Sequence, residues 1–560
     1  MLYLEKRHDP RKNSKLIEEI TGRKLNTAEA IRETELLLQN NSCSVPPFHD
    51  FEGTQGLSIL KKLKTSFLRF LLTEPARPTE NSAPTLVDEL GNAFPEWKEL
   101  LDKEYNHLQN TITREVNVEN FGAVGDGITD CTEAFKKAIG NGKVIVRIPA
   151  GIFVTKGITL PSMTRLVGSG KGVTTIKLHK QASKGTRLIT NRNHWKGNSH
   201  ISVAELSLDW NVERLGDAKK TCTWGNHSSC LTFANVTFGW VKNVEAINPG
   251  LHGFDISSTL YNYTGDGYRA RGGSEYIWLD QLNGHGFGDD GITTHHSKNI
   301  LISNSHMCDP SGRAHAKGFS NSNGIEVDDG SQHIWLLNNS TARCFGGVEI
   351  KAHGNSSAAN HVQIIGHLSV NDNRSYNFRH IGHHQITDPE SRTAFQIMAT
   401  NIVALAPVFT DLYEGSTPRG MVISAYKNVA VNYFTLIGDP IYDYANNPVI
   451  AIQYRARNVS LKHITIRHFK KAGVDINVFG GANHADNIAI SSVNVQNSAP
   501  RAIQIGSGIN NASVDQLHAV GRNGKYALKA EPSSTIVSNV QSEGYKIQIS
   551  LGGKESREFS

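Results

Sequence analysis

The sequence lacks several features that mark common classes of protein. No apolar run approaches the roughly 18 residues that span a membrane, and the first ten residues contain no apolar stretch typical of a secretory signal. There is no dense stripe of Lys and Arg with interleaved aromatic residues, so the formal net charge of +6 does not indicate nucleic-acid binding. We therefore expect a protein made in the cytoplasm that binds neither membrane nor nucleic acid.

Cysteine is also scarce, with six residues in 560 and neither a CxxC pair nor a metal-finger spacing. In a chain long enough for a large core, such cysteines are typical of buried thiols rather than of a disulfide framework. No HExxH or comparable ligand spacing singles out a transition metal. Glycine, by contrast, is abundant at 51 residues, which is common where short strands alternate with tight turns.

The first 112 residues have the spacing of helices and few β-branched residues. Helices are predicted at 15–39, 57–72 and 96–113, and the last carries an apolar seam spaced like a short coiled coil. Its members are Trp97, Leu100, Leu101, Tyr105 and Leu108. We interpret 1–112 as a helical head that oligomerises or attaches the chain to a larger structure. The alternative is a small helical domain that packs on the rest.

From residue 116 onward, the pattern changes to short alternating runs separated by Gly, Asn, Ser and Asp. A motif of Gly, apolar, variable, apolar recurs, and successive copies from Gly291 to Gly324 and on to Gly347 are 33 and 23 residues apart. Such steps correspond to one coil of a parallel β-helix, where each coil buries its apolar face only by stacking on its neighbours. A sandwich or barrel would need paired hairpin spacings, which are missing. We predict a β-helix over 113–545 and a tail over 546–560.

The start of this region has a recognisable form. A Gly-Asp-Gly-x-x-Asp turn at 125–130 precedes an amphipathic segment at 132–139 and an apolar run at 144–153. This opening resembles that of the pectate-lyase-like superfamily. The resemblance implies an all-β, right-handed, single-stranded parallel β-helix whose open end is capped by the amphipathic helix. A cap is needed because the terminal coil otherwise exposes unpaired strand edges and an apolar cross-section.

Polar residues follow the apolar positions of several repeats. Because residues two apart in a strand point the same way, the second and fourth residues after each glycine should face solvent. Stacked coils lie about 4.8 Å apart, so we expect these side chains to form one cluster. The predicted catalytic residues are Asp289, His295, Glu326, Asp328, Glu349, Lys351 and His353. The alternative is a solvated polar ladder, and Asp290 and Asp329 are interpreted as turn residues.

Carboxylates this close together raise the pKa of one of them or recruit a cation, for which Ca²⁺ or Mg²⁺ is a candidate. Histidine is also dense between His285 and His384, which suggests phosphate handling, proton transfer or metal ligation. Arg379, His380 and Trp335 are predicted to contact substrate.

Longer segments carry a more specific resemblance. The runs 290–296, 323–331, 346–354, 374–384 and 454–458 are similar to those of the preneck appendage (tailspike) proteins of small podophages that infect Bacillus. The resemblance implies a homotrimeric virion spike that adsorbs to the host cell wall and degrades its glycerol-phosphate teichoic acid. It also implies that the N-terminal segment binds phage neck or tail proteins.

Cutting a phosphodiester needs an activated water, neutralised phosphoryl oxygens and a protonated leaving group. Lys351, with His295 or His353, is predicted to face the phosphate, while Asp289, Glu326 or Asp328 holds a cation or activates water. Glu349 would orient the phosphodiester or protonate its leaving group.

Three alternatives stay open: a glycoside hydrolase with two carboxylates, a lyase, and a non-catalytic spike that uses aromatic platforms such as Trp278, Trp335 and Tyr376.

Overall fold

The computed structural model describes residues 2–43, 83–223, 225–260, 272–353, 357–381, 391 and 393–556. The helix predicted at 57–72 lies outside these residues. Within them, no helix is both long enough and apolar enough to cross a bilayer. Four of the six cysteines are buried free thiols, and none of the six forms a disulfide.

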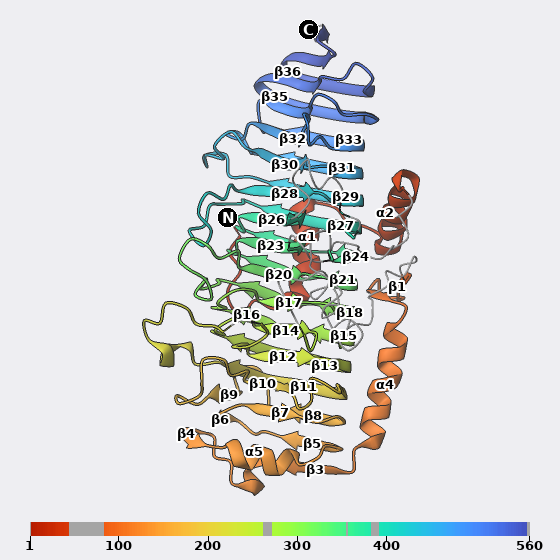
Figure 1. Ribbon diagram of the computed structural model, residues 1–560. Helices are drawn as coiled ribbons and strands as arrows, with labels where there is room; N and C mark the ends of the chain where they lie inside the picture. Colours follow the sequence, from red (N-terminus) through yellow and green to blue (C-terminus); the bar gives the residue numbers. More distant parts are fainter. Residues whose placement is uncertain are drawn as a thin grey trace, which may run out of the picture.

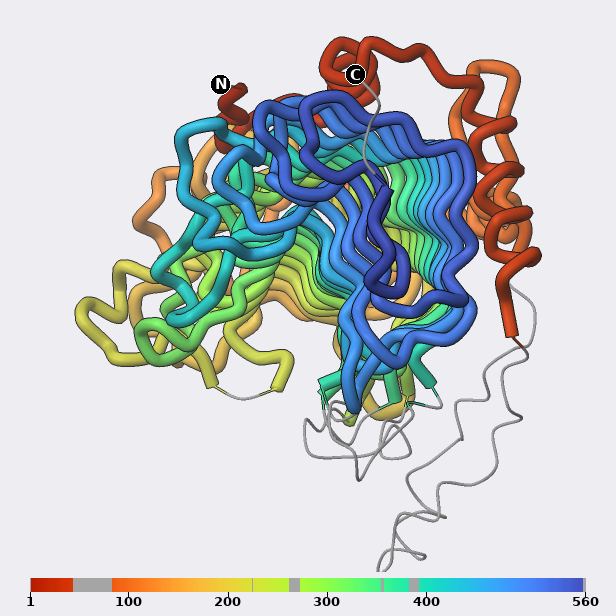
Figure 2. The backbone as a smooth tube through the Cα atoms, turned by 90° about the horizontal axis from the view of Figure 1, so that it is seen from above, coloured from red at the N-terminus to blue at the C-terminus, as the bar shows by residue number. Residues whose placement is uncertain are grey.

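The chain winds into a parallel β-helix, as predicted, whose coils stack along one axis (Figures 1 and 2). Successive strands contribute to three columns of hydrogen-bonded neighbours. Column A contains β7 (Ile158–Leu160), β10 (Ile189–Asn191), β12 (Leu231–Ala234), β14 (Phe254–Ser257), β17 (Ile292–Thr294), β20 (Asn323–Val327), β23 (Gly346–Ala352), β26 (Arg374–His380), β28 (Arg419–Ser424), β30 (Pro448–Gln453), β32 (Val474–Val478) and β34 (Arg501–Ile505).

The other two columns are made of short strands and of long strands that bend from one column into the next. Column B contains β3 (Arg114–Asn117), β5 (Val144–Arg147), β8 (Thr164–Val167), β15 (Glu275–Asp280), β18 (Lys298–Ser303), β21 (Gln332–Leu337) and β24 (Asn360–Ile365). Column C contains β4 (Asp126–Asp130), β6 (Gly151–Thr155), β9 (Thr174–Leu178), β16 (Asn283–His285), β19 (His306–Cys308), β22 (Ser340–Ala342) and β25 (Leu368–Val370). Strands β11 (Asn198–Asp209), β13 (Val236–Ile247), β27 (Phe395–Leu405), β29 (Lys427–Ile437), β31 (Arg457–Arg467) and β33 (Asp486–Gln496) run through both.

The core of the solenoid is apolar and continuous along its length. Within column A, Ile292, Ile325 and Val348 are register partners in neighbouring strands, and all three are fully buried. Each coil therefore buries its apolar residues against the same position of the next coil, which is how a solenoid accumulates stability. The turns between columns B and C use a left-handed backbone, at Asn304 and Asn338 for example, a conformation that Asn tolerates well.

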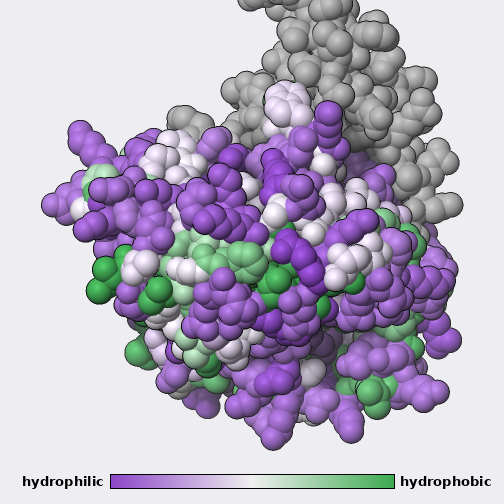
Figure 3. All heavy atoms as spheres, turned by 90° about the horizontal axis from the view of Figure 1, so that it is seen from below, coloured by the Kyte–Doolittle hydropathy of each residue, from purple (hydrophilic) through white to green (hydrophobic). Residues whose placement is uncertain are grey.

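Helix α5 (Thr132–Ile139) covers the first coil, as the sequence predicts (Figure 1). Its apolar face buries Ala134, Phe135, Ala138 and Ile139, and the Phe135 ring meets Phe153 edge-on at 6.4 Å. Hydrophilic side chains dominate the surface at this end of the molecule, with smaller apolar groups between them (Figure 3). The cap therefore replaces an apolar cross-section with a mostly polar one.

The described N-terminal segment packs along one side of the solenoid (Figure 2). It contains η1 (Pro10–Lys12), α1 (Asn13–Thr21), α2 (Thr27–Asn41), the hairpin β1 (Thr85–Val87) and β2 (Ala93–Pro95), and α4 (Lys98–Thr111). Helix α2 contacts β27, β29 and β31, and α4 contacts β11 and β13. The apolar residues predicted to form a coiled-coil seam pack within this chain, because Leu101 and Leu108 are buried against Trp240 of column B. The described residues 2–43 and 83–112 therefore pack on the solenoid, as the alternative interpretation expects, while an oligomerising or attachment role stays a prediction.

The C-terminal coils extend beyond the predicted boundary at residue 545. Strand β35 (Ala512–Ala530) pairs with β36 (Ile536–Leu551), and β37 (Lys554–Ser556) folds back antiparallel on β36. Most of the region interpreted as a tail is therefore part of the last coil. Two 3-10 turns, η2 (Val118–Phe121) and η3 (Val212–Leu215), complete the described elements.

Candidate functional site

A polar ladder runs along the outer side of column A, on the opposite side of each strand from the core. Asp255, Thr293, Glu326, Glu349 and Asn377 are consecutive register partners in β14, β17, β20, β23 and β26. This is the stacking that the repeat motifs predict. Glu326 and Glu349 are therefore direct neighbours, separated by the strand spacing of about 4.8 Å, whereas Thr293 lies between Asp255 and Glu326.

The prediction that these side chains face solvent is wrong. Glu349 and Asp255 have no exposed surface, and Glu326 and Lys351 are 3% and 5% exposed. The reason lies in two long connections, around residues 216–228 and 309–322, whose side chains join the acids in lining a single cavity. The outer face of the β-helix thus becomes the floor of a covered site, where charges interact more strongly than on a surface.

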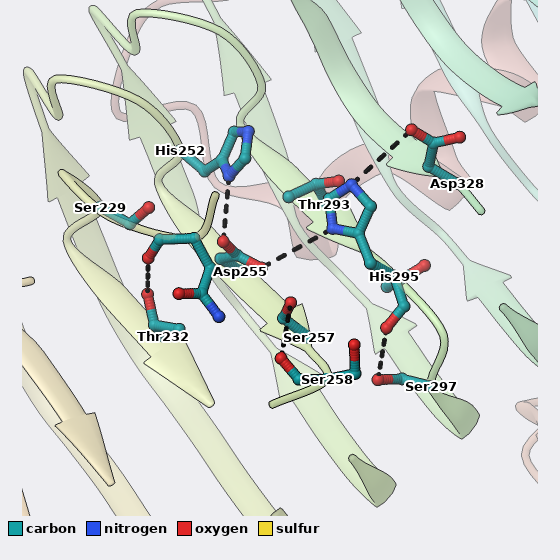
Figure 4. A network of polar contacts seen from close by, with 12 residues as sticks. Ser229, Thr232, His252, Asp255, Ser257, Ser258, Thr293, His295, Ser297 and Asp328 are labelled. Atoms are coloured by element: carbon teal, nitrogen blue, oxygen red, sulfur yellow. Dashed lines mark hydrogen bonds and ion pairs between the residues drawn. The ribbon is translucent and has the colours of Figure 1, made fainter. Parts of the chain in front are cut away.

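A chain of alternating histidines and aspartates crosses this floor (Figure 4). His252 Nδ1 lies 3.2 Å from Asp255 Oδ2, and His295 Nδ1 lies 3.8 Å from Asp255 Oδ1. The other ring nitrogen of His295 lies 3.6 Å from Asp328 Oδ2. Burial lowers the pKa of both imidazoles, but their aspartate partners outweigh it and raise the pKa to about 9 for His252 and about 10 for His295. Both rings are therefore cationic at neutral pH.

Lys351 is the central cation of the site. Its Nζ lies 2.6 Å from Glu326 Oε1 and 3.7 Å from Asp328 Oδ2. Burial lowers its pKa, but Glu326 and Asp328 outweigh that effect and hold the pKa well above the usual value. The lysine therefore acts as a fixed positive charge and not as a base.

The pKa values of two neighbouring aspartates are shifted in opposite directions. The pKa of Asp289 is lowered against the effect of burial, because His315 Nε2 lies 2.9 Å away and His252 Nε2 lies 3.7 Å away. The pKa of Asp290 is raised well above its usual value by burial and by the charges of Asp289 and Glu326. Asp290 is no simple turn residue, since it accepts hydrogen bonds from the backbone and side-chain nitrogens of Asn323 at 2.9 and 3.0 Å.

A second aspartate interpreted as a turn residue is also part of the site. Asp329 is fully buried, and its Oδ2 lies 3.1 Å from Nδ1 of His353. His353 also lies 3.7 Å from Asp328. Burial lowers the pKa of His353, but the charge of Asp328 and the contact with Asp329 raise it overall. Because 29% of this side chain is exposed, the imidazolium can exchange protons with solvent.

The cavity over this floor has a volume of about 220 Å³. Of the predicted catalytic residues, Asp289, Glu326, Asp328, Lys351 and His353 line it. His315, from the histidine-dense run between His285 and His384, also lines it, as do His252, Asp290 and Cys222, which the sequence analysis does not assign to a site. His295 and Glu349 do not line it. His295 lies behind Asp328, and Glu349 accepts hydrogen bonds from Asn377 Nδ2 and Arg379 Nε.

The three predicted substrate-binding residues lie outside the cavity. Arg379 pairs with Glu349, and His380 Nδ1 lies 2.6 Å from Ser391 Oγ. Trp335 is on column B, fully buried beneath the N-terminal segment, where its Nε1 donates to Thr85 Oγ1 at 2.9 Å. The prediction for Trp335 is therefore wrong, because a segment distant in sequence covers it. Trp278 packs beside Trp97 on the same column, and Tyr376 belongs to the core.

Three sets of described residues place cation-binding atoms within 4.8 Å of one another. They are His252, Asp289 and Asp290; His295, Glu326 and Asp328; and Asp328, Asp329 and His353. Each set combines one imidazole with two carboxylates. Ca²⁺ and Mg²⁺ prefer oxygen ligands, whereas imidazole suits Zn²⁺ and other transition metals. The first set also contains Asp290, whose pKa is raised by burial and by the charges of Asp289 and Glu326.

The model of the pectate-lyase-like rhamnogalacturonase A/epimerase family matches residues 115–349. A putative phage-related protein of Bacillus subtilis, YobO, is 48% identical over 517 residues, which are 92% of this chain and 63% of that protein. The pre-neck appendage protein of Bacillus phage phi29 is 40% identical over 448 residues, which are 79% of this chain and 51% of the phage protein.

Solved structures agree with these relationships. The crystal structure of pre-mature phi29 gene product 12 aligns with a TM-score of 0.75 and 37% identity, over 83% of this chain and 60% of that one. An N-terminal fragment of the same phage protein aligns with a TM-score of 0.74 and 36% identity, over 82% of this chain and 76% of the fragment. This chain spans between about half and two thirds of the length of the curated relatives named above. The chain belongs to the family of Bacillus phage pre-neck appendage proteins, built on a pectate-lyase-like parallel β-helix.

Proposed function

We propose that this protein is an appendage of a phage or prophage that binds the bacterial cell wall and hydrolyses the phosphodiester bonds of glycerol-phosphate teichoic acid. The reaction would take place in the cavity over column A. The observation that carries the proposal is the pairing of a fixed cation, Lys351, with two partly exposed histidines whose pKa is raised, His315 and His353. A phosphodiester needs this combination of a charge that neutralises phosphoryl oxygens and an acid that protonates the leaving alkoxide.

The described contacts suggest a division of roles. Lys351, held by Glu326 and Asp328, would face the phosphoryl oxygens. His315 and His353 line the cavity with 28% and 29% of their side chains exposed, so either imidazolium could donate the proton to the leaving oxygen. Asp290, whose raised pKa makes it the stronger base of the Asp289–Asp290 pair, would take the proton of the attacking water.

A divalent cation is the alternative use of the same carboxylates, and Asp290 would then act as a ligand instead of as the base. His252, Asp289 and Asp290 are the residues that would hold it, and it would supply Lewis-acid polarisation of the phosphoryl group. Because the pKa of His252 is raised to about 9, binding through its ring would have to release a proton. The deep burial of all three residues favours a cation, since it would relieve the repulsion between the two carboxylates.

A glycoside hydrolase is the second candidate, favoured by the family model over residues 115–349. Such an enzyme needs one protonated and one ionised carboxyl group, and Asp290 with Asp289 shows that difference in pKa. Glu349 is poorly suited to the acid role, because it pairs with Arg379 and does not line the cavity. A polysaccharide lyase and a non-catalytic binding spike remain outcomes of the test.

The assembly of the protein is part of the same proposal. The described N-terminal residues, or those at 44–82, would contact phage neck or tail proteins, and three copies would form the spike at the surface of the virion. The relationship to the pre-neck appendage protein of phage phi29 supports the association with a phage particle. Sedimentation of the purified chain would test the trimer independently of activity.

The activity is tested by incubating the protein with purified poly(glycerol phosphate) teichoic acid and, separately, with polygalacturonate, each with and without chelator. Shortened glycerophosphate chains or free glycerol phosphate would support the proposal. Unsaturated uronates would indicate a lyase and new reducing ends a glycoside hydrolase. Retention of either polymer without any product would indicate a binding spike.

A further inference from the structure

Two arginines lie side by side just beyond the acidic part of column A. Arg374 begins β26 and Arg419 begins β28, and the two are direct register partners in adjacent parallel strands. Their Cα atoms are therefore separated by about the strand spacing of 4.8 Å. Like charges placed directly opposite each other in a sheet are destabilising. A chain that keeps such a pair needs a compensating negative charge.

Among the residues that the structure describes, no carboxylate forms an ion pair with either arginine, and the charge of Glu349 compensates that of Arg374 only in part. The Nε atoms of Arg374 and Arg419 are both buried and have no hydrogen-bond partner among them. The nearest carboxylate in β23, Glu349, is already paired with Arg379. Burial, with the charges of Arg379 and Arg419, lowers the pKa of Arg374 to about 10, so the guanidinium remains charged at neutral pH. A buried donor left unsatisfied on a charged group carries a large cost.

The pair is bordered by aromatic side chains that reach the surface. The guanidinium carbon of Arg374 lies 5.6 Å from the ring centroid of Phe345, whose ring lies 5.2 Å from that of Tyr413. Tyr413 forms an isolated β-bridge with Phe319, and these two side chains are 38% and 62% exposed. A cationic pair thus adjoins an exposed apolar surface, which suits a polymer with alternating anionic groups and carbon-rich units.

We infer that Arg374 and Arg419 form an anion subsite that binds one charged group of the polymer, with Tyr413 and Phe319 contacting the adjoining carbon skeleton. The inference rests on the proposed function, because it places a second phosphate of the same chain at this pair. Strand β26 directly follows β23, which carries Lys351. The subsite therefore begins one coil beyond the cavity, and a polymer could occupy both at once and gain affinity from the linkage.

The test uses the full chain carrying Asp290→Asn, so that binding is measured with the proposed base removed. Calorimetric titration with poly(glycerol phosphate) oligomers, polygalacturonate and neutral dextran gives the Kd for each. We expect Arg374→Gln and Arg419→Gln each to raise the Kd for the phosphate polymer about tenfold or more. The exposed Arg522→Gln, on β35, should leave it unchanged. Dextran should bind weakly in every variant.

Two further measurements separate binding from folding and from turnover. Because removing one of two facing cations relieves repulsion, Arg419→Gln should melt at the same or a higher temperature than the parent in the absence of polymer. Without Asp290→Asn, both arginine variants should lose more of their rate on the polymer than on a single glycerophosphodiester unit, since that substrate is too short to occupy the cavity and the subsite together. An unchanged Kd for both anionic polymers in both variants would overturn the subsite. A rise for polygalacturonate alone would support an anion subsite while contradicting the teichoic acid assignment.

Discussion

Lys351 Nζ lies 2.6 Å from Glu326 Oε1, an ion pair that joins two neighbouring coils beneath a covered cavity. Glu326 is the register partner of Glu349, so the lysine two residues later reaches back across the sheet to the preceding coil. Thr293 Oγ1 donates to the other oxygen of Glu326 at 3.0 Å, and Asn323 Nδ2 donates to Oε1 at the same distance. Both oxygens of the carboxylate therefore have partners in this chain, and the proposed role of Glu326 is to hold the lysine.

Replacing Lys351 with Met should both destabilise the protein and inactivate it. The change leaves Glu326 and Asp328 buried without their cation, which typically costs about 3–5 kcal/mol. The matched control is Lys298→Met, because Lys298 forms an exposed pair with Glu275 at 3.2 Å that should contribute under about 1 kcal/mol. Denaturant unfolding of the two variants measures the difference, and equal destabilisation would contradict the central place of Lys351.

Replacing His353 with Gln should slow cleavage in a way that depends on the leaving group. If the imidazolium protonates the alkoxide, we expect loss of about 10²-fold or more on teichoic acid, and little loss on a nitrophenyl phosphodiester, whose leaving group needs no proton. His315→Gln distinguishes the two candidate acids by the same comparison. His518→Gln, on the exposed side of β35, is the control. Equal losses on both substrates would assign His353 a structural role instead.

Stability should depend on pH through His295. Its pKa is raised to about 10, so its contribution to stability is complete below the ordinary histidine pKa of about 6.5 and is lost as pH rises through 10. Between pH 6 and pH 10.5, we expect the free energy of unfolding of the parent to fall by roughly 4 kcal/mol more than that of His295→Gln, at about 1.4 kcal/mol for each unit of the shift. Urea titrations in chelator across this range measure it. Parallel pH profiles for the two proteins would show that His295 is not held protonated.

The cap is predicted to protect the first coil. Phe135→Ala removes a ring that is 1% exposed, and such truncations cost about 3–5 kcal/mol. The control is Val173→Ala, since Val173 is 49% exposed. We expect a lower melting temperature and aggregation only for the Phe135 variant, because the uncovered coil presents unpaired strand edges. Light scattering during heating records both effects.

The fold and the floor of the site could be predicted from sequence because both follow from short-range periodicity. The alternation around Gly324 and Gly347 fixes which side chains face away from the core, and stacking then brings Glu326 next to Glu349. Burial could not be predicted in this way. It depends on two long connections without periodic pattern, and they turn a presumed surface ladder into a cavity.

The other cavity residues also lack a periodic signal in the sequence. His315 comes from one of the covering connections, and His252 directly precedes a repeat motif at a position without alternation. Asp290 was interpreted as a turn residue because it follows another aspartate. The prediction that Trp335 contacts substrate fails for a different reason, since the Thr85 side chain that covers it is 250 residues away in sequence. Packing between such distant segments leaves no local pattern in the sequence.

The most direct test of the account is ³¹P nuclear magnetic resonance of poly(glycerol phosphate) teichoic acid during incubation with the parent protein and with Asp290→Asn. The parent should convert the phosphodiester resonance into phosphomonoester resonances. Asp290→Asn mimics the protonated aspartate and should retain the fold, yet react about 10²-fold more slowly or worse. A phosphodiester resonance that stays unchanged with the parent protein would contradict the proposed function.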